Sequence, residues 1–582
     1  MNIRCGLHGL TLLVVLGNLG WAMLLTPVAA APLPVTTAAC DIGLVYVGNT
    51  EVDLSILYQG AVTIYRNDIP IFTATSGNNT AAFKTDTGLV KGQRYTYRGV
   101  VDADGQRWTC NSTPFDVVAG EVSGLLTRDV TWAGDRWAIS PTLTLAEGVR
   151  LTIAPSTTVQ GPPGATFPGS GGLHLSHNAR LTANGATLSD LAVYGLGTTS
   201  VLAIQDSTLH NAAIAGGQMT TFARNTGRSD GSVYIQTDVP AGQTLEFADN
   251  VLPGYQVAIT LNSSTAGVHL TGNTLTGVEI APTSSTPQLD GDYLIANNVF
   301  TETLNSWGLT VANLRQGTLT IANNLNVPFL ELRDFFTGTL GTRRVSGNTL
   351  QRQLTLRNVD HLMVEDNIIA VTYPDNYGIQ MENASYNQIV RNRLRYTQNG
   401  ASYPVVGIGI GFGGSYGAIY STHNEVFSNT LQNFYHTQPG EGVGIGLGFA
   451  SDTLIRDNIF IDNRRNIQLG AYDPYNQGTN DGEHPANNRV YNNIFARRTG
   501  TGVANFWISA PCTTEACVNT WAVAKTPGSN IIGGAYLGGN CWSDYVGADP
   551  DGDGLGNTAY ELNADNSDPR PLFSADCARP DL

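Results

Sequence analysis

Three aspartates at alternate positions near the C-terminal end are the residues whose types and spacing point most clearly to chemistry. The loop that contains them reads DPDGDGLGN over 549–557. A hard cation such as Ca²⁺ binds several oxygen ligands, which a tight glycine turn can bring together. The predicted calcium ligands are Asp549, Asp551, Asp553, the backbone carbonyl of Leu555, and Asn557.

The second half of this loop departs from an EF-hand-type loop. Its twelfth position is Tyr560 instead of Glu, and Glu561 follows one residue late. A more distant acid, Asp544 or Asp568, is then expected to complete the ligand shell. A solvated acidic turn without a metal is the alternative. A bound Ca²⁺ is expected to stabilise the C-terminal segment and to take no part in catalysis.

A second candidate site is a groove for a sugar chain on one β-sheet of the later repeats. Apolar pairs such as Ile379 and Met381 are expected to face inward, so the residues between them face outward. The outward positions form two rows: Gln380, Gly409, Gly446 and Gln468, then Glu382, Gly411, Gly448 and Gly470. Tyr-rich insertions border this glycine trough, and aromatic rings with amides suit the apolar faces and hydroxyls of sugars. The predicted substrate ligands are Gln380, Gln468, Tyr377, Tyr435 and Tyr472, although the glycines would also relieve crowding between strands.

Cleavage of a polysaccharide in this trough would require further groups. Hydrolysis uses two carboxylates about 5 to 10 Å apart, and Glu382 with Glu441 is the predicted pair, with Asp462 in reserve. A lyase would instead use a base, Arg464 or Arg465, beside a bound cation. Whether the protein is a glycoside hydrolase, a polysaccharide lyase or no enzyme is left open by the sequence.

A recurring asparagine indicates which structural elements position these residues. The gaps between successive members range from 19 to 37 residues. Repeats of roughly 20 to 50 residues are typical of solenoids, in which each unit buries its apolar face on its neighbours. The recurring positions are Asn225, Asn250, Asn273, Asn298, Asn324, Asn348, Asn367, Asn392, Asn429, Asn458 and Asn493.

This repeat predicts an all-β protein, a right-handed parallel β-helix preceded by a small β-sandwich. In the later repeats an apolar residue lies three positions before each Asn and another two positions after it, a pattern that suits short strands. We expect each Asn to adopt the left-handed conformation of a sharp corner and its amide to hydrogen-bond along the solenoid axis. The alternative, asparagine-rich loops of a β-sandwich, would not keep one spacing over roughly 270 residues.

The chain is expected to divide into four parts. Residues 1–30 read as a secretory signal, with an apolar stretch and a small-residue cleavage site after Ala30, and an uncleaved anchor is the alternative. Residues 31–120 form the predicted sandwich, in which Leu89, Gly92 and Tyr95 resemble the tyrosine corner of fibronectin type III or immunoglobulin-like domains. Residues 121–535 form the β-helix, and residues 536–582 a C-terminal cap held by calcium and a disulfide.

Charge and cysteine content limit the partners. The net charge of −16 argues against a nucleic-acid partner, which requires clustered Lys and Arg. Six of the seven cysteines follow the signal segment, an even number that suits an oxidising compartment. Six cysteines allow 15 pairings, and we predict those that each bracket one local module: Cys40 with Cys110, Cys512 with Cys517, and Cys541 with Cys577. We expect a secreted, cell-surface or periplasmic monomer without a transmembrane anchor after cleavage.

The C-terminal motifs resemble those of NosD-like parallel β-helix proteins. The segments are GGNCWSDY (538–545), the acidic glycine-rich loop that follows, and DPRPL (568–572), with Cys541 where that family commonly has Tyr. The resemblance implies a β-helix and a copper-related role in the maturation of nitrous oxide reductase. Copper sites draw on Met, His and Cys, and the candidates here are few: Met219, Met363, Met381, His174 and His177.

These observations favour a protein that binds an extracellular polysaccharide, and they leave open whether it also cleaves that polysaccharide. The alternatives are a non-enzymatic surface, adhesion or stalk protein and, with less support from the residues, a copper accessory protein. Calcium is the only cofactor predicted.

Overall fold

The computed structural model describes residues 40–103, 105–162, 171–196, 199–228, 233–282, 288–301, 308–335, 342–372, 377–397, 405–411, 420–435, 442–470, 485–497, 504–508 and 517–578. The predicted signal, 1–30, lies outside these ranges. Strands dominate, with a short 3-10 helix at Ala575–Ala578. In the described ranges no helix is long and apolar enough to cross a membrane. The chain divides into two compact units, one ending at Gly120 and the other beginning at Glu121.

The N-terminal unit is built from antiparallel strands: β1 (Cys40–Val47), β2 (Glu51–Arg66), β3 (Ile69–Thr87), β4 (Arg94–Ala103) and β5 (Gln106–Val118). The expected disulfide between Cys40 and Cys110 joins β1 to β5. The Tyr95 hydroxyl accepts a 2.8 Å hydrogen bond from the Val90 amide, and Leu89 is buried beside it. Membership of the fibronectin type III or immunoglobulin-like class stays a prediction.

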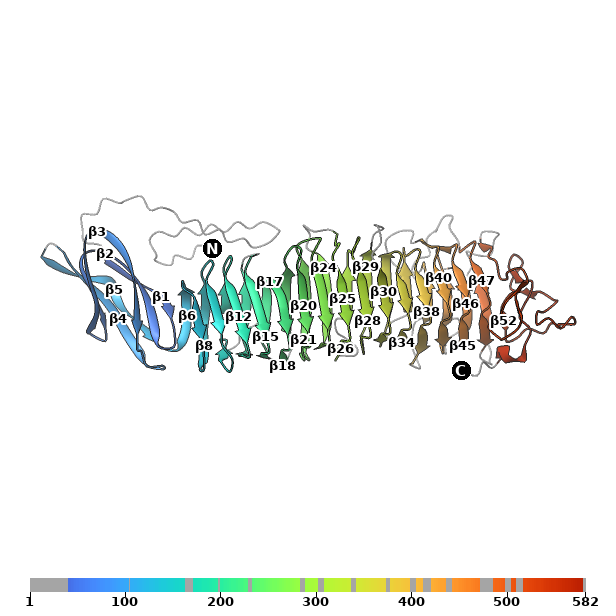
Figure 1. Cartoon of the computed structure of the whole chain (residues 1–582), viewed down its shortest axis with the longest axis horizontal. Coiled ribbons are helices and arrows are strands. Elements are labelled where there is room, and N and C mark those ends of the chain that lie inside the picture. The colour runs from blue at the N-terminus through green and yellow to red at the C-terminus, as the bar shows by residue number, and fades with distance from the viewer. Residues whose placement is uncertain are drawn as a thin grey trace. The chain divides into compact units, whose positions relative to one another are not determined.

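The second unit is a parallel β-helix, whose coils follow one another in chain order (Figure 1). Connections between parallel strands of one sheet are right-handed in nearly all proteins, and the chain forms a right-handed β-helix. The coils build three faces, named sheets 1, 2 and 3, and in some coils the third face is formed by an isolated bridge such as that of Val251 instead of a strand. Sheet 1 contains, in order, β8 (Arg136–Leu145), β11 (Gly172–Leu175), β14 (Ala192–Gly195), β17 (Ala213–Ala223), β19 (Val233–Val239), β21 (Tyr255–Leu261), β24 (Gly277–Pro282), β27 (Leu309–Ala312), β29 (Leu330–Phe335), β32 (Leu354–Val359), β35 (Tyr377–Glu382), β38 (Val406–Ile410), β42 (Val443–Leu447), β46 (Arg465–Leu469) and β49 (Ala504–Ile508).

Sheets 2 and 3 complete each coil. Sheet 2 includes β20 (Thr244–Ala248), β22 (Gly267–Thr271), β25 (Tyr293–Ala296), β28 (Leu319–Ala322), β30 (Arg343–Ser346), β33 (Met363–Glu365), β36 (Gln388–Val390), β40 (Glu425–Phe427), β44 (Leu454–Arg456) and β47 (Arg489–Tyr491). Sheet 3 includes β31 (Thr349–Leu350), β34 (Ile368–Val371), β37 (Arg393–Tyr396), β41 (Thr430–Gln432), β45 (Ile459–Asn463), β48 (Ile494–Arg497) and β52 (Cys541–Trp542).

The core is a stack of apolar side chains in register. One inward row of sheet 1 is at most 1% exposed at every coil: Ile235, Val257, Val278, Leu309, Leu330, Leu354, Ile379, Ile408, Ile445 and Ile467. Because neighbouring strands lie about 4.8 Å apart, each member packs on the residues above and below it. Every coil is therefore stabilised by its neighbours.

The recurring asparagines form a buried ladder between sheets 2 and 3. Each side-chain amide donates to the Oδ1 of the next asparagine at 2.8 to 3.0 Å, from Asn225 through to Asn540. Each Oδ1 also accepts the backbone N–H of the asparagine one coil earlier. The expected stacking along the axis is thus confirmed.

The expected backbone conformation of these asparagines is wrong. The positive φ belongs to the residue immediately before each asparagine of the ladder from Asn225 to Asn493, such as Asp249 (55°), Asn297 (58°) and Arg391 (52°). The preceding residue makes the corner, which leaves the asparagine side chain free to point into the core and reach the next coil.

A second, shorter ladder follows another corner. Asn387 donates to Asn424, and Asn488 donates to Asn519, through their backbone and side-chain N–H groups. The Asn519 backbone N–H donates in turn to the Oδ1 of Asn566, at 2.9 Å.

Candidate functional site

The three C-terminal aspartates converge. Asp549, Asp551 and Asp553 each place a carboxylate oxygen within 4.8 Å of the others. Asp549 accepts hydrogen bonds from the backbone N–H of Asp553 at 3.2 Å and of Gly554 at 2.8 Å, and Asp553 accepts one from Leu555 at 2.8 Å. These bonds fix a tight turn whose carboxylates point to one side, an arrangement that fits a hard cation.

A lysine competes for this acidic turn. Lys525 donates to Asp553 in an ion pair, which lowers the pKa of Asp553 and raises that of Lys525. The Lys525 ammonium group therefore occupies a carboxylate oxygen that a metal ion would need, and its positive charge would repel that ion. Of the other predicted ligands, Leu555 buries its side chain in the cap, leaving only its carbonyl for a metal, and Asn557 is exposed.

The two distant acids do not complete the ligand shell. Asp568 is fully buried, and its carboxylate accepts hydrogen bonds from the N–H groups of Asn540, Trp542 and Arg570. Burial raises the pKa of Asp568 to about 6. Asp544 accepts a 3.0 Å hydrogen bond from the Tyr560 hydroxyl. Asp568 thus has a structural role, and its assignment as a metal ligand is wrong.

The predicted trough on sheet 1 is in register but is not bare. Gln380, Gly409, Gly446 and Gln468 are paired coil by coil as expected, yet Gly409 and Gly446 are buried. Nearby glycines allow close approach of the backbone: a Cβ on Gly378, Gly407 or Gly444 would lie 2.5 to 2.6 Å from a carbonyl oxygen of the next coil. The crowding explanation therefore holds for those three glycines.

Glu382 is held in an ion pair. Its Oε2 accepts a 2.7 Å hydrogen bond from Arg357 and its Oε1 one of 2.7 Å from Gln380. The Glu382 side chain is 8% exposed, whereas that of Arg357 is 46% exposed. The hydrogen bond to Glu382 raises the pKa of Arg357. The structure thus brings Gln380 and Glu382 together, but with both carboxylate oxygens occupied.

The other predicted residues do not gather around Glu382. Asp462 is exposed near the end of β45 in sheet 3, two coils beyond the coil that contains Glu382, which is roughly 10 Å along the axis alone. Gln468 is buried and accepts a 3.1 Å hydrogen bond from Arg465. Tyr435 lies under the guanidinium of Arg464, and Tyr377 begins β35. Glu441 and Tyr472 lie outside the described residues.

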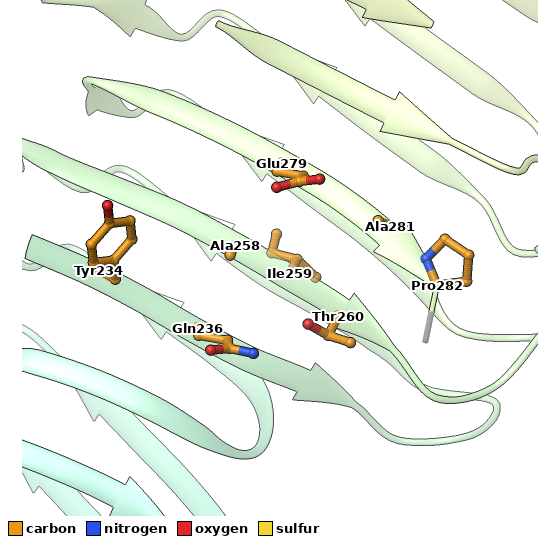
Figure 2. A pocket seen from close by; sticks show the side chains of 8 residues that line it. All are labelled: Tyr234, Gln236, Ala258, Ile259, Thr260, Glu279, Ala281 and Pro282. Carbon is orange, nitrogen blue, oxygen red and sulfur yellow. The ribbon is translucent and has the colours of Figure 1, made fainter. Parts of the chain in front are cut away.

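A hollow that the sequence did not predict lies on the outer face of β19, β21 and β24 (Figure 2). Its volume is about 310 Å³, near the lower end for small-molecule sites. Gln236 and Glu279 rise on either side of the short Ala258, and Tyr234 stands at one end. The signal was present in the sequence, because the outward row of Gln380 can be followed back coil by coil to Gln236.

Paired charges continue along this face. Arg333 lies 3.6 Å from Glu279, and Arg357 lies 3.4 Å from Glu331 and 2.7 Å from Glu382. The pairs of Glu279 and Glu331 link coils at the surface, where each contributes little to stability, whereas Glu382 is buried. Next to the hollow, burial raises the pKa of Asp238.

A solenoid with stacked strands on three faces and buried asparagine ladders defines a parallel β-helix protein. Residues 440–547 match the sequence model of a family described as "Periplasmic copper-binding protein (NosD)". The chain is a right-handed parallel β-helix protein, and its residues 440–547 are similar to that family. No curated protein sequence matches the chain.

Several solved structures are similar at low identity. A family 28 exopolygalacturonase of Yersinia enterocolitica is 10% identical, over 73% of this chain and 96% of that one, with a TM-score of 0.25. The A-module of the Azotobacter vinelandii mannuronan C-5 epimerase AlgE6 is 14% identical, over 60% and 88%, with a TM-score of 0.26. The catalytic domain of a GH87 alpha-1,3-glucanase is 13% identical, over 68% and 93%, with a TM-score of 0.25. These values are too low to support any inference about the chemistry of this chain.

Three of the five Met and His residues considered for copper are engaged in packing, whereas Met363 is half-buried and His177 is exposed. Met219 and Met381 are fully buried in the core, and His174 packs edge-on against Tyr194. Cys541 forms the expected disulfide with Cys577, and Cys517 is also disulfide-bonded, while its predicted partner Cys512 lies outside the described residues. Within the described ranges, the aspartates of the C-terminal turn are the one group of three or more His, Cys, Asp or Glu that converges.

Proposed function

We propose that the outer face of sheet 1 binds an extracellular polysaccharide. The observation that carries this proposal is the hollow over β21, which combines an aromatic ring, an amide and a carboxylate. A sugar presents apolar ring faces and a rim of hydroxyls, so its site needs both kinds of group. Tyr234, Gln236 and Glu279 supply them.

The geometry favours binding over cleavage. A glycosidase needs one carboxyl group that is protonated at the start of the reaction and a second carboxylate beside it. Both carboxylate oxygens of Glu382 already accept hydrogen bonds, one from Arg357 and one from Gln380, so neither oxygen is placed to give a proton to a substrate. Glu382 therefore fits the role of a positioning group for Arg357 and Gln380 better than that of a general acid.

The test is a glycan-array and polysaccharide-depolymerisation screen on the purified mature chain. We expect saturable binding without product formation, and loss of that binding when Gln236 and Glu279 are both changed to Ala. Gln388→Ala, at an outward position of sheet 2, is the matched control and should bind normally. Absence of binding across a broad panel would refute the proposal.

A rigid stalk or adhesion element is the second candidate function. The continuous asparagine ladder favours this function. Its buried side-chain hydrogen bonds, repeated from coil to coil, stiffen the solenoid whether or not a ligand binds. A stalk is expected to bind no polysaccharide, so the screen described above distinguishes a stalk from a polysaccharide-binding protein.

For the C-terminal turn we propose a structural Ca²⁺ ion. The convergence of three carboxylates supports it, and the ion would hold the turn against the cap core that contains Leu555 and Leu572. We further propose that the protein is exported, since disulfides such as Cys40–Cys110 and Cys541–Cys577 persist in oxidising compartments.

A further inference from the structure

One outward row of sheet 1 alternates between long and small side chains. Ten consecutive coils contribute to this row, which we name the groove row. Its members are paired in register along the solenoid: Tyr194, Ala215, Gln236, Ala258, Glu279, Thr310, Glu331, Thr355, Gln380 and Gly409. Every long member carries a hydrogen-bonding group, and each small member from Ala215 to Thr355 lies between two long ones. The alternation ends at Gly409, which is followed by Gly446.

The alternation gives the face a period of two coils. Neighbouring strands are about 4.8 Å apart, so the long side chains recur roughly every 10 Å. The hollow of Figure 2 is one unit of this pattern, with Ala258 between Gln236 and Glu279. Thr310, between Glu279 and Glu331, repeats the arrangement.

This period is matched by one kind of polysaccharide. In an extended β-1,4-linked chain of hexopyranoses each ring is turned over relative to the previous one. The same ring edge therefore returns at every second sugar, at a spacing close to two coils. Coiled polymers such as α-1,4-linked glucans do not present one edge at this interval.

The charge on the face selects among such chains. Glu279 and Glu331 are partnered by Arg333 and Arg357, and Arg357 is shared with Glu382. Both of these arginines are thus already balanced by carboxylates, so a polyuronate would meet repulsion from the three acids. An uncharged sugar can use the same carboxylates as hydrogen-bond acceptors.

We propose that the groove row binds an uncharged β-1,4-linked hexose polymer in its extended form, with the polymer axis along the solenoid. This inference rests on the proposed function and specifies its ligand. A packing explanation competes with it, because a long side chain can simply lie over a small neighbour 4.8 Å away. The two explanations differ in what happens when a small member is enlarged.

Calorimetric titration of the mature full-length chain tests this. The ligands are cellohexaose, N-acetylchitohexaose and β-1,4-mannohexaose, compared with maltohexaose and hexagalacturonate. We expect at least one of the three neutral β-1,4 hexamers to bind, and to bind more tightly than its tetramer. Ala258→Gln and Thr310→Gln should each weaken it about tenfold or more, equivalent to about 1.4 kcal/mol.

The matched control is Ala322→Gln, an equal enlargement at an outward position of sheet 2. It should leave binding unchanged, and melting curves of all three variants check that they fold. Equal binding of maltohexaose or hexagalacturonate would overturn the inference, as would full affinity in folded Ala258→Gln. If another polysaccharide binds and is lost with Gln236 and Glu279, the proposed function stands and this inference falls. If no polysaccharide binds, both fall.

Discussion

The carboxylate of Asp568 accepts a 2.7 Å hydrogen bond from the backbone N–H of Asn540, where the long asparagine ladder ends. At each earlier step the acceptor is the side chain of another asparagine, so Asp568 takes the place of the next one. The indole of Trp542 donates to the same oxygen at 2.9 Å. At the shorter ladder Asn566 does the same, accepting from Asn519 and from the indole of Trp521 at 3.0 Å. One short segment therefore terminates both ladders.

Stability should fall as the pH rises from about 4 to about 6. Burial raises the pKa of Asp568 from 3.8 to about 6 in the folded protein. In this window the unfolded chain loses the proton while the folded chain keeps it, so the unfolded chain binds fewer protons and unfolding is favoured. This shift in pKa corresponds to about 3 kcal/mol in the free energy of unfolding, and that contribution is fully lost above pH 6. Urea denaturation at closely spaced pH values measures the slope.

The variant that checks the assignment is Asp568→Asn, which does not titrate. Between pH 4 and 6, this variant should lose most of the pH dependence of the unfolding free energy that the Asp568 carboxyl group contributes. An unchanged slope in the variant would mean that other groups cause it.

Loss of one ladder amide should be costly. Asn324 is fully buried; it donates to Ile295 at 2.9 Å and to Asn348 at 2.8 Å, and accepts from Asn298. Asn324→Ala leaves these buried partners unpaired and should lower the free energy of unfolding by about 3 kcal/mol or more. Asn297→Gly is the matched control, since Asn297 is exposed at a φ of 58° that glycine accepts, and it should change stability by about 0.5 kcal/mol or less. Equal urea midpoints for the two variants would contradict a structural role for the ladder.

Calcium should raise the melting temperature of the protein, and Lys525 should weaken the binding of Ca²⁺. Removing the ammonium group in Lys525→Met frees Asp553, so the variant should bind Ca²⁺ more tightly than the native chain. Asp551→Asn should weaken binding. Differential scanning calorimetry with Ca²⁺ and with EDTA measures the shift, and Mg²⁺ serves as the ion control. No calcium-dependent shift in any of the three proteins would show that the turn is only solvated.

Glu382→Gln should cost stability instead of catalysis. The change removes the charge that pairs with Arg357 and places an amide against Gln380, at a side chain that is 8% exposed. We expect a loss of about 1 to 2 kcal/mol in the free energy of unfolding. Should the screen reveal a depolymerase whose activity disappears in this variant at unchanged stability, Glu382 would be catalytic and the positioning role would be wrong.

Much of the fold followed from spacing alone. The asparagine recurrence predicted the solenoid, because a ladder buried at every coil requires the same residue type once per turn. The Cys40–Cys110 and Cys541–Cys577 disulfides followed from the way each pair brackets one module. The alternate aspartates of the C-terminal turn converge as their sequence separation implied, since so short a loop leaves few other conformations.

The sequence by itself thus determined the repeating element, its inward and outward positions and the local acidic turn. Only the tertiary structure decided that the left-handed residue precedes each asparagine, that Asp568 ends a ladder, that Glu382 is paired with Arg357, and that the hollow lies over Ala258. The physical reason is that these relations join residues of different coils, separated by insertions of unequal length. They are fixed by the lateral pairing of strands about 4.8 Å apart, which no local pattern specifies.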